Sequence, residues 1–301
     1  VVADGVMTPP PSKWAGHAAL ASAQVAFGLF PIFGTLAFGP GGVTPLGLGV
    51  WRIAAGGLVL ALLVAWQRGP SALLPARADV PRILACAWLG VALNQGLFLS
   101  GLARSTPMSA GIVMCLIPVF TYAAALLAGQ ERLRLDRLAG LAIALCGVGP
   151  LVFPEGIGVI AGYGLGNALL VCNAAAYSAY VVLGKPLVAR YPPLVVTAWA
   201  YLGSFVAIPA FARDADLLPA PDATMAWAGL VYVVVFPTIL GYLANLFALA
   251  RVPATTTAVY VYVQPIVAGI GAWWMFAERP GTNMAVAALA LLTGVGLVVR
   301  R

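Results

Sequence analysis

The chain has 301 residues, of which 62% are hydrophobic and only 8% are charged, and its mean hydropathy is +0.99. A soluble domain carries roughly a quarter charged residues, and a globule of this length lacks the interior to bury so many apolar side chains. The composition therefore excludes a water-soluble protein. It indicates an all-α integral membrane protein, in which each crossing needs about 20 apolar residues as a helix.

In chain order, a polar, proline-rich segment comes first. Residues 1–12 read V-V-A-D-G-V-M-T-P-P-P-S, so we expect residues 1–13 to be a disordered cytoplasmic tail and not a signal peptide. Ten apolar runs follow, and the short connections between them leave no room for a soluble domain. The predicted spans 1 to 10 are residues 14–38, 45–67, 80–102, 106–129, 135–153, 159–183, 193–212, 223–248, 252–277 and 281–299.

The basic residues predict the orientation of these spans. Ten spans put both termini on one side of the membrane, and with that side inside, twelve of the sixteen lysines and arginines fall in inner segments. The acidic residues divide almost evenly between the two sides. Because lysine and arginine set membrane topology, we expect both termini in the cytoplasm. The net charge of +7 is then explained by topology, and no nucleic-acid partner is expected.

The second half of the chain repeats the first. Residues 102–120 and 249–267 both begin L-A-R and both reach a proline fourteen positions after the arginine. A shift of 147 residues aligns Leu93 with Leu240, Pro118 with Pro265, Glu131 with Glu278, Gly147 with Gly294 and Gly149 with Gly296, and a slip of one matches Pro45 and Trp51 with Pro193 and Trp199. Chance similarity of apolar helices is the alternative, which the matching Arg, Pro, Glu and Gly residues disfavour.

A repeat of five spans has an odd number of crossings, so the second copy enters the membrane in the opposite sense. This predicts two inverted five-helix repeats, residues 14–153 and 154–301, around a central cavity near the membrane midplane. Such an architecture is typical of transporters.

Each copy has the pattern P-x12-E in its fourth span and G-x-G in its fifth. With these motifs, over residues 14–299, the chain resembles the EamA-type drug/metabolite transporter superfamily, which includes exporters of amino acids, other metabolites and cationic drugs. The resemblance implies ten helices in the bacterial inner membrane and a cavity lined mainly by spans 1, 3, 4, 6, 8 and 9. One departure is Phe27-Gly28 in span 1, where the family commonly has Trp-Gly.

Polar and aromatic side chains occur in several of the spans that the resemblance assigns to the cavity. A polar side chain inside a membrane is costly and usually faces a cavity or the bundle interior, and spacings of three, four or seven residues place most of each set on one helical face. Hydrogen bonding between helices is the alternative for any one of them. The candidate substrate-binding residues are Gln24 and Phe27; Asn94, Gln95 and Phe98; Asn173, Tyr177 and Tyr180; Tyr242 and Asn245; and Tyr260, Tyr262 and Gln264, with Tyr262 on a different face.

Pro118 and Pro265 each remove a backbone hydrogen bond from the fourth helix of a repeat, so we expect both helices to kink there. Their matching positions favour hinges, and static bends are the alternative. Arg52 is the one basic residue well inside a span, about 10 Å from its outer end. It could bind a substrate carboxylate, although snorkelling outward or binding loop carbonyls is the interpretation that we favour at this point. Glu131 and Glu278 lie at helix ends beside Arg132 and Arg279, which predicts caps or ion pairs.

Other functional classes lack their motifs. The sequence contains a single histidine and four cysteines without paired spacing, and it lacks the motifs H-E-x-x-H, G-x-S-x-G and G-x-x-x-x-G-K-[ST]. These features disfavour an enzyme, a metal site or a cofactor. No filter motif suggests a channel. None of the nine acidic residues lies in mid-span, which favours uncoupled transport.

We therefore expect a non-enzymatic exporter of small metabolites that works by alternating access, with neutral or aromatic amino acids as preferred substrates. Its partners would be the substrate and membrane lipid, and a monomer is favoured. An exporter of drugs or other metabolites, which could be coupled to protons, is the alternative.

Overall fold

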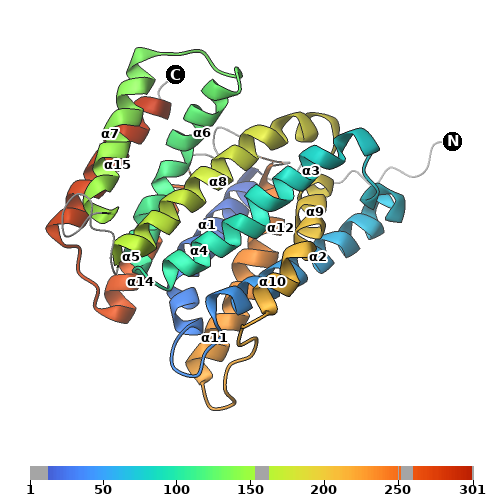
Figure 1. Ribbon diagram of the computed structural model, residues 1–301, viewed down its shortest axis with the longest axis horizontal. Coiled ribbons are helices and arrows are strands. Elements are labelled where there is room, and N and C mark those ends of the chain that lie inside the picture. Colours follow the sequence, from blue (N-terminus) through green and yellow to red (C-terminus); the bar gives the residue numbers. More distant parts are fainter. Residues whose placement is uncertain (1–12, 153–162, 250, 252–259, 300–301) are drawn as a thin grey trace.

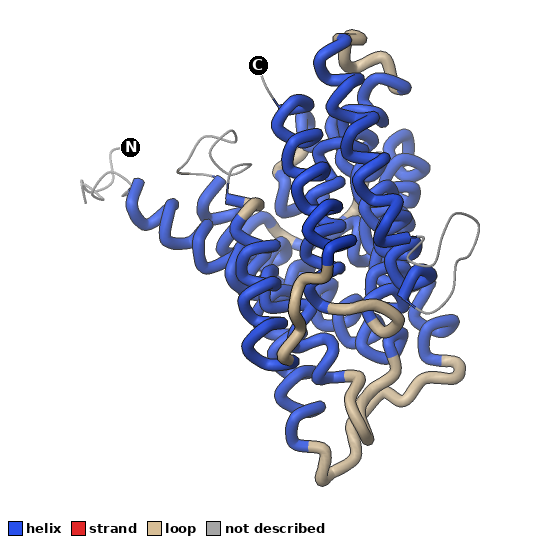
Figure 2. The backbone as a smooth tube through the Cα atoms, turned by 90° about the vertical axis from the view of Figure 1, so that its left-hand side faces the viewer, coloured by secondary structure: helices blue, strands red, loops and turns tan. Residues whose placement is uncertain are grey.

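The computed structural model describes residues 13–152, 163–249, 251 and 260–299. These residues form helices, turns and loops and contain no strand (Figure 2). The α-helices are α1 (Lys13–Ala37), α2 (Pro45–Arg68), α3 (Val80–Ala87), α4 (Leu93–Leu102), α5 (Pro107–Val113), α6 (Ile117–Leu127), α7 (Leu135–Val152), α8 (Tyr163–Arg190), α9 (Pro193–Gly203), α10 (Ile208–Ala212), α11 (Thr224–Val233), α12 (Gly241–Leu249), α14 (Val263–Phe276) and α15 (Thr282–Val299). The expected tail lies outside the described residues, except that Lys13 already begins α1.

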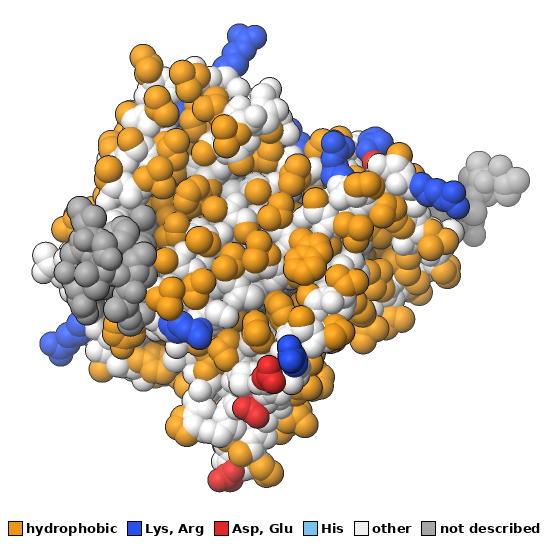
Figure 3. All heavy atoms as spheres, in the orientation of Figure 1, with side chains coloured by type: hydrophobic (Ala, Val, Ile, Leu, Met, Phe, Trp, Pro, Cys, Tyr) orange, Lys and Arg blue, Asp and Glu red, His pale blue; other side chains and the backbone are white. Residues whose placement is uncertain are grey.

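Seven helical stretches of the described chain are long and apolar enough to cross a membrane. They are Trp14–Ala37, Pro45–Arg68, Pro70–Leu102, Pro107–Leu127, Tyr163–Arg190, Pro193–Ala212 and Thr224–Asn245, and Val263–Phe276 and Thr282–Val298 are shorter apolar helices. Large apolar side chains such as Leu127, Trp274 and Trp66 are more than 80% exposed, and hydrophobic side chains cover much of the face in Figure 3. This surface suits lipid, so the described part of the chain has the character of a helical membrane protein.

Four of the predicted spans are interrupted by π-helical or 3-10 turns. A π-helical turn, Trp88–Ala92, separates α3 from α4, and a longer one, Val234–Leu240, separates α11 from α12. The 3-10 turns Met114–Leu116 and Ser204–Ala207 precede α6 and α10. Prolines explain three of these breaks, because Pro118, Pro209 and Pro237 cannot donate the backbone hydrogen bond that a regular helix needs.

The helix contacts made by the first half of the chain correspond to those made by the second half. The first span, α1, packs against α11, α12 and α14, which belong to spans 8 and 9. The sixth span, α8, packs against α4 and α6, which belong to spans 3 and 4. Spans 2 and 7 meet through α2 and α9, and spans 5 and 10 meet through α7 and α15, the pair seen side by side at the left of Figure 1.

Glycines bring α7 and α15 into close contact. A Cβ placed on Gly140 would lie 2.5 Å from the Gly294 carbonyl oxygen, and one on Gly294 would lie 2.5 Å from the Gly140 carbonyl oxygen. Gly147 is equally restricted, because a Cβ there would meet the Cβ of Ala290. Small residues at such a crossing let two membrane helices approach closely. In each G-x-G motif only the first glycine has this role, since Gly149 and Gly296 face open space.

The two aligned tryptophans make equivalent hydrogen bonds. Trp51 in α2 donates its indole N–H to the Leu217 carbonyl, at 2.6 Å, in the loop before α11. Trp199 in α9 donates to the Leu73 carbonyl, at 3.1 Å, in the segment before α3. Trp51 thus binds the connection that precedes α11, and Trp199 binds the connection that precedes α3.

A buried carboxylate reinforces the second of these contacts. Asp79 forms an ion pair with Arg190 and accepts a hydrogen bond of 2.7 Å from the Tyr191 hydroxyl. That hydrogen bond raises the pKa of Tyr191, which lies between α8 and α9. The connection before α3 is therefore attached to the one before α9.

Candidate substrate-binding site

Three amide side chains from spans 1, 8 and 9 meet along α1. Gln264 donates to the Gln24 side-chain oxygen at 2.6 Å, and the Gln24 amide lies 3.4 Å from the Asn245 side-chain oxygen. Gln24 is 2% exposed. The sequence predicted these three residues as cavity-lining groups, and the structure brings them into one network, which we call the amide cluster.

Aromatic rings continue from the amide cluster along the same helices. Phe27, one turn beyond Gln24 on α1, meets Tyr242, one turn before Asn245 on α12, edge to face at 5.9 Å between ring centroids. Tyr242 meets Tyr201 of α9 in the same way at 5.8 Å. Tyr201 is buried, and its hydroxyl has no hydrogen-bond partner within the described chain.

Arg52 lies beyond these rings on the same surface, and the environment of its side chain differs from the one that we expected. Its side chain is 5% exposed, so it neither snorkels outward nor binds loop carbonyls. The guanidinium donates from Nε to the Thr238 hydroxyl at 2.8 Å and from Nη1 to the Gln95 side-chain oxygen at 2.6 Å. It also lies 4.1 Å from the centroid of the Phe30 ring. Arg52 is buried because α2 turns its side chain towards α4 and the π-helical turn before α12. Two neutral acceptors, the Gln95 amide and the Thr238 hydroxyl, lie within hydrogen-bonding distance there.

The polar residues of span 3 divide between two roles. Gln95 and Phe98 are buried and face the guanidinium side, where Phe98 stacks on Phe30 at 4.7 Å. Asn94 contributes its backbone, because its carbonyl accepts a hydrogen bond of 2.8 Å from the Asn173 amide of α8. In this structure Asn173 therefore connects two helices.

The two tyrosines of α8 lie beside each other. The ring centroids of Tyr177 and Tyr180 are 5.7 Å apart. Tyr180 also lies against Gly90, in the π-helical turn between α3 and α4, where a Cβ would collide with the ring. The absence of a side chain at Gly90 is what allows α8 to bring this tyrosine close to span 3.

The tyrosines of span 9 lie apart from this group. Tyr260 is hydrogen-bonded to His17 at 3.0 Å, and Tyr262 packs against the hydrophobic core. We expected Tyr260 and Gln264 on one helical face, but α14 begins only at Val263, after a turn at residues 261–262. Pro265 explains the break, because it cannot donate to the carbonyl of Val261.

The other proline at which we expected a kink also lies at a break in the α-helix. Pro118 is the second residue of α6 and follows the 3-10 turn Met114–Leu116. The helices are thus interrupted at both predicted positions.

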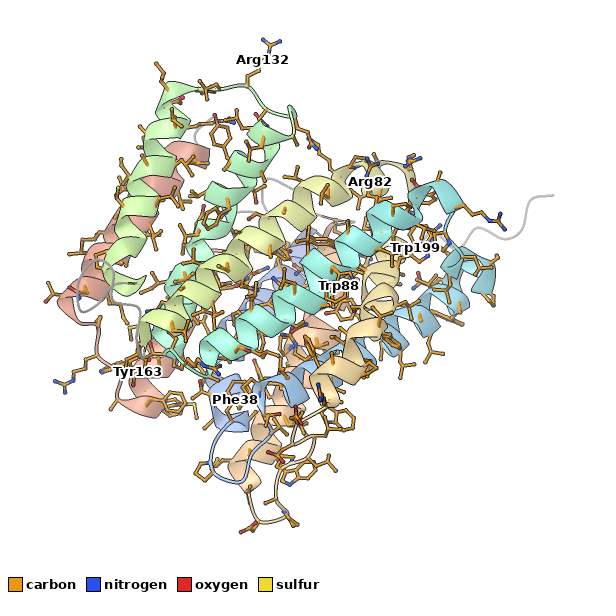
Figure 4. The ribbon with its side chains drawn as sticks, in the orientation of Figure 1. Phe38, Arg82, Trp88, Arg132, Tyr163 and Trp199 are labelled. Atoms are coloured by element: carbon orange, nitrogen blue, oxygen red, sulfur yellow. The ribbon has the colours of Figure 1, made fainter. Side chains whose placement is uncertain are left out.

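The two glutamates lie at helix ends, as expected, with different partners. Glu278 accepts a hydrogen bond of 3.4 Å from the Met108 backbone at the start of α5. Glu131 pairs with Arg137 at 3.2 Å, and not with the adjacent Arg132, which a short loop directs away from the protein (Figure 4).

Sequence reasoning missed Tyr201, Thr238 and Phe30. Tyr201 lies in span 7, which the resemblance does not assign to the cavity, and Thr238 lies within an irregular turn where helical spacing does not apply. A signal was present for Phe30, which follows Gln24 and Phe27 at the same three-residue interval.

Comparison with known proteins places the relatives of this chain among transporters. The model of the EamA-like transporter family matches residues 14–153 and 164–300. A probable terminal-alkyne amino-acid exporter from Streptantibioticus cattleyicolor is 27% identical over 272 residues, which is 89% of each chain. An uncharacterized transporter from Archaeoglobus fulgidus is 25% identical over 85% of this chain and 88% of its own. One solved crystal structure shares the fold, with a TM-score of 0.62 and 19% identity over 96% of this chain and 97% of the other.

Proposed function

The chain belongs to the EamA-like transporter family, and we propose that it exports small metabolites, foremost neutral and aromatic amino acids, across the bacterial inner membrane by alternating access. The observation that carries this proposal is the surface formed by the amide cluster, the rings of Phe27, Tyr242 and Tyr201, and Arg52. Amides and phenols can hydrogen-bond a small polar molecule, and the rings can stack on its apolar part.

Several contacts support two inverted five-helix repeats. The pairing of span 1 with spans 8 and 9 corresponds to that of span 6 with spans 3 and 4. The reciprocal glycine contacts of α7 and α15 and the equivalent hydrogen bonds of Trp51 and Trp199 follow the same correspondence. In such a pair of repeats, the site lies at the interface between them and opens to one side at a time.

The positions of charged side chains support cytoplasmic termini. Arg82 and Arg132, which belong to predicted inner segments, lie towards the upper edge of the molecule in Figure 4, whereas Phe38 and Tyr163, near predicted outer ends, lie towards the lower edge. Acidic side chains gather at the lower tip (Figure 3). An excess of lysine and arginine on the upper side would make that side cytoplasmic.

Uncoupled transport is supported by what surrounds the site. The described carboxylates that form ion pairs, Asp79, Glu131 and Asp136, lie at helix ends, and none of them contacts the amide cluster or Arg52. Coupled transporters usually hold a proton-binding acid within the membrane. Amino acids are the preferred cargo because the site combines amides with phenols and because one relative is named as an amino-acid exporter.

Counterflow tests this proposal. Proteoliposomes preloaded with an unlabelled amino acid should transiently accumulate the same labelled compound, equally with and without a pH gradient. Accumulation that requires the gradient would replace uncoupled transport by proton coupling. The absence of counterflow for every amino acid of the panel would overturn the substrate class and direct the search to drugs or other metabolites.

A further inference from the structure

The charge of Arg52 is buried without a partner of opposite charge. The ion pairs of the described chain join Arg134 to Asp136, Arg137 to Glu131, and Arg190 to Asp79, all away from Arg52. The acceptors at Arg52 are a hydroxyl and an amide, both neutral. Burying a charge against neutral groups alone is costly, and natural structures usually supply an opposite charge.

The guanidinium still has donors to offer. Nε and Nη1 each make one hydrogen bond, while Nη2 has no acceptor among the described residues. Contacts with Thr238 and Gln95 hold the planar group in one orientation over the Phe30 ring. An oriented guanidinium with free N–H groups suits a carboxylate, which it can bind through two parallel hydrogen bonds.

The groups around Arg52 follow one another in an order that suits a small zwitterion with a side chain. Gln24, Phe27 and Phe30 follow one another on α1, so the amide cluster and Arg52 lie roughly 9 Å apart along that helix. On the facing segment of the same chain, the contacting residues lie in the matching order Asn245, Tyr242 and Thr238. A charged end and an amide end are thus separated by an aromatic middle.

We propose that Arg52 binds the carboxylate of the transported molecule, so that the substrate supplies the missing negative charge and carboxylate-bearing compounds are selected over their uncharged or cationic analogues. This inference rests on the proposed transport function and names the chemical group that the site requires. The aromatic rings beyond Arg52 would receive the substrate side chain, and the amide cluster would bind its far polar end.

Two ligands that differ only in this group test the inference on the unmodified protein. L-phenylalanine and L-phenylalaninamide share a side chain and an amino group, and only the first has a carboxylate. In proteoliposomes that exchange labelled L-phenylalanine, unlabelled L-phenylalanine should compete at least about tenfold better than the amide. If another amino acid of the panel exchanges faster, it replaces phenylalanine, with its own carboxamide as the comparison.

Variants of Arg52 then identify the residue responsible. Arg52→Gln should raise the half-saturation concentration for phenylalanine by roughly 10- to 100-fold and abolish the preference over the amide, whereas Arg52→Lys should keep the preference with weaker binding. Arg104→Gln is the matched control, because the Arg104 side chain is exposed and hydrogen-bonds the Ser100 carbonyl one turn earlier, away from the site. Thermal unfolding in detergent should show Arg52→Gln at least as stable as wild type, since it removes an unpaired buried charge.

The outcomes separate this inference from the proposed function. Equal competition by phenylalanine and its amide in the wild type, or a preference that survives in Arg52→Gln, overturns the role of Arg52 and leaves amino-acid export standing. A lowered melting temperature of Arg52→Gln, with both ligands affected equally, makes the residue structural and also overturns it. Counterflow of no amino acid at all overturns the proposed function, and the carboxylate assignment with it.

Discussion

At the scale of single residues, burial alone does not reveal what a polar side chain does. Asn173 and Asn245 are both amides on predicted cavity-facing helices. In the structure Asn173 is engaged with the backbone of Asn94, while Asn245 joins two other side chains in the amide cluster. A group that already stabilises the helix backbone has less freedom to bind a ligand than one in a side-chain network, which can exchange partners.

We predict from this difference that Asn245→Ala impairs transport more than it impairs folding. Loss of one interhelical hydrogen bond costs about 0.6 kcal/mol in a membrane protein, whereas loss of a substrate contact should lower counterflow by about tenfold. Thr293→Ala is the control, because it removes a hydrogen bond to the Leu289 carbonyl of the same helix, outside the site. Wild-type counterflow in both Asn245→Ala and Tyr177→Ala would contradict the site described here.

At the scale of helices, a repeated motif does not give its members equal roles. Both G-x-G motifs contain one glycine at the α7–α15 contact and one that faces open space. Both prolines of the fourth spans coincide with breaks in the α-helix, although a 3-10 turn makes the first break and the late start of α14 makes the second.

We predict opposite effects for the two glycines of the second motif. Gly294→Ala forces a Cβ against the backbone of Gly140 and should destabilise the protein by about 1–3 kcal/mol. Gly296→Ala meets no neighbour and should be neutral or stabilising by about 0.5–1 kcal/mol, because alanine loses less entropy in a helix. Melting temperatures of the two purified variants decide the matter, and equal values would mean that the helix contact is looser than described.

We also predict that Pro118 acts on the rate of transport. If the break before α6 is a hinge, Pro118→Ala restores a continuous helix and should slow counterflow several-fold with little change in half-saturation concentration. A static bend would leave both quantities near wild type. Initial rates measured over a range of substrate concentrations distinguish the two.

At the scale of the whole molecule, the proposed inverted repeats have a direct test in membrane topology. With the four native cysteines replaced by alanine, Asp222→Cys should react with a membrane-impermeant maleimide in intact cells. Arg132→Cys should react only after the cells are permeabilised. Both positions are exposed loop residues. Labelling of both from the same side would contradict opposite orientations of the two loops and the topology proposed above.

The sequence by itself determined the membrane class, the approximate extent of the helices and the family. These follow from hydropathy and from motifs within single spans, which depend on local order along the chain. It also pointed to Gln24, Phe27, Gln95, Phe98, Tyr242, Asn245 and Gln264, which the structure brings to one surface, because they lie on continuous stretches of helix where a spacing of three or four residues defines a face.

Only the tertiary structure decided the partners of Arg52, the participation of Tyr201 and Thr238, and the separation of Tyr260 from Gln264. The physical reason is that the π-helical turns, the 3-10 turns and the break before Val263 each rotate the following residues out of helical phase. Which side chain meets which neighbour then depends on how separate helices rotate and cross, and no spacing within one span contains that information.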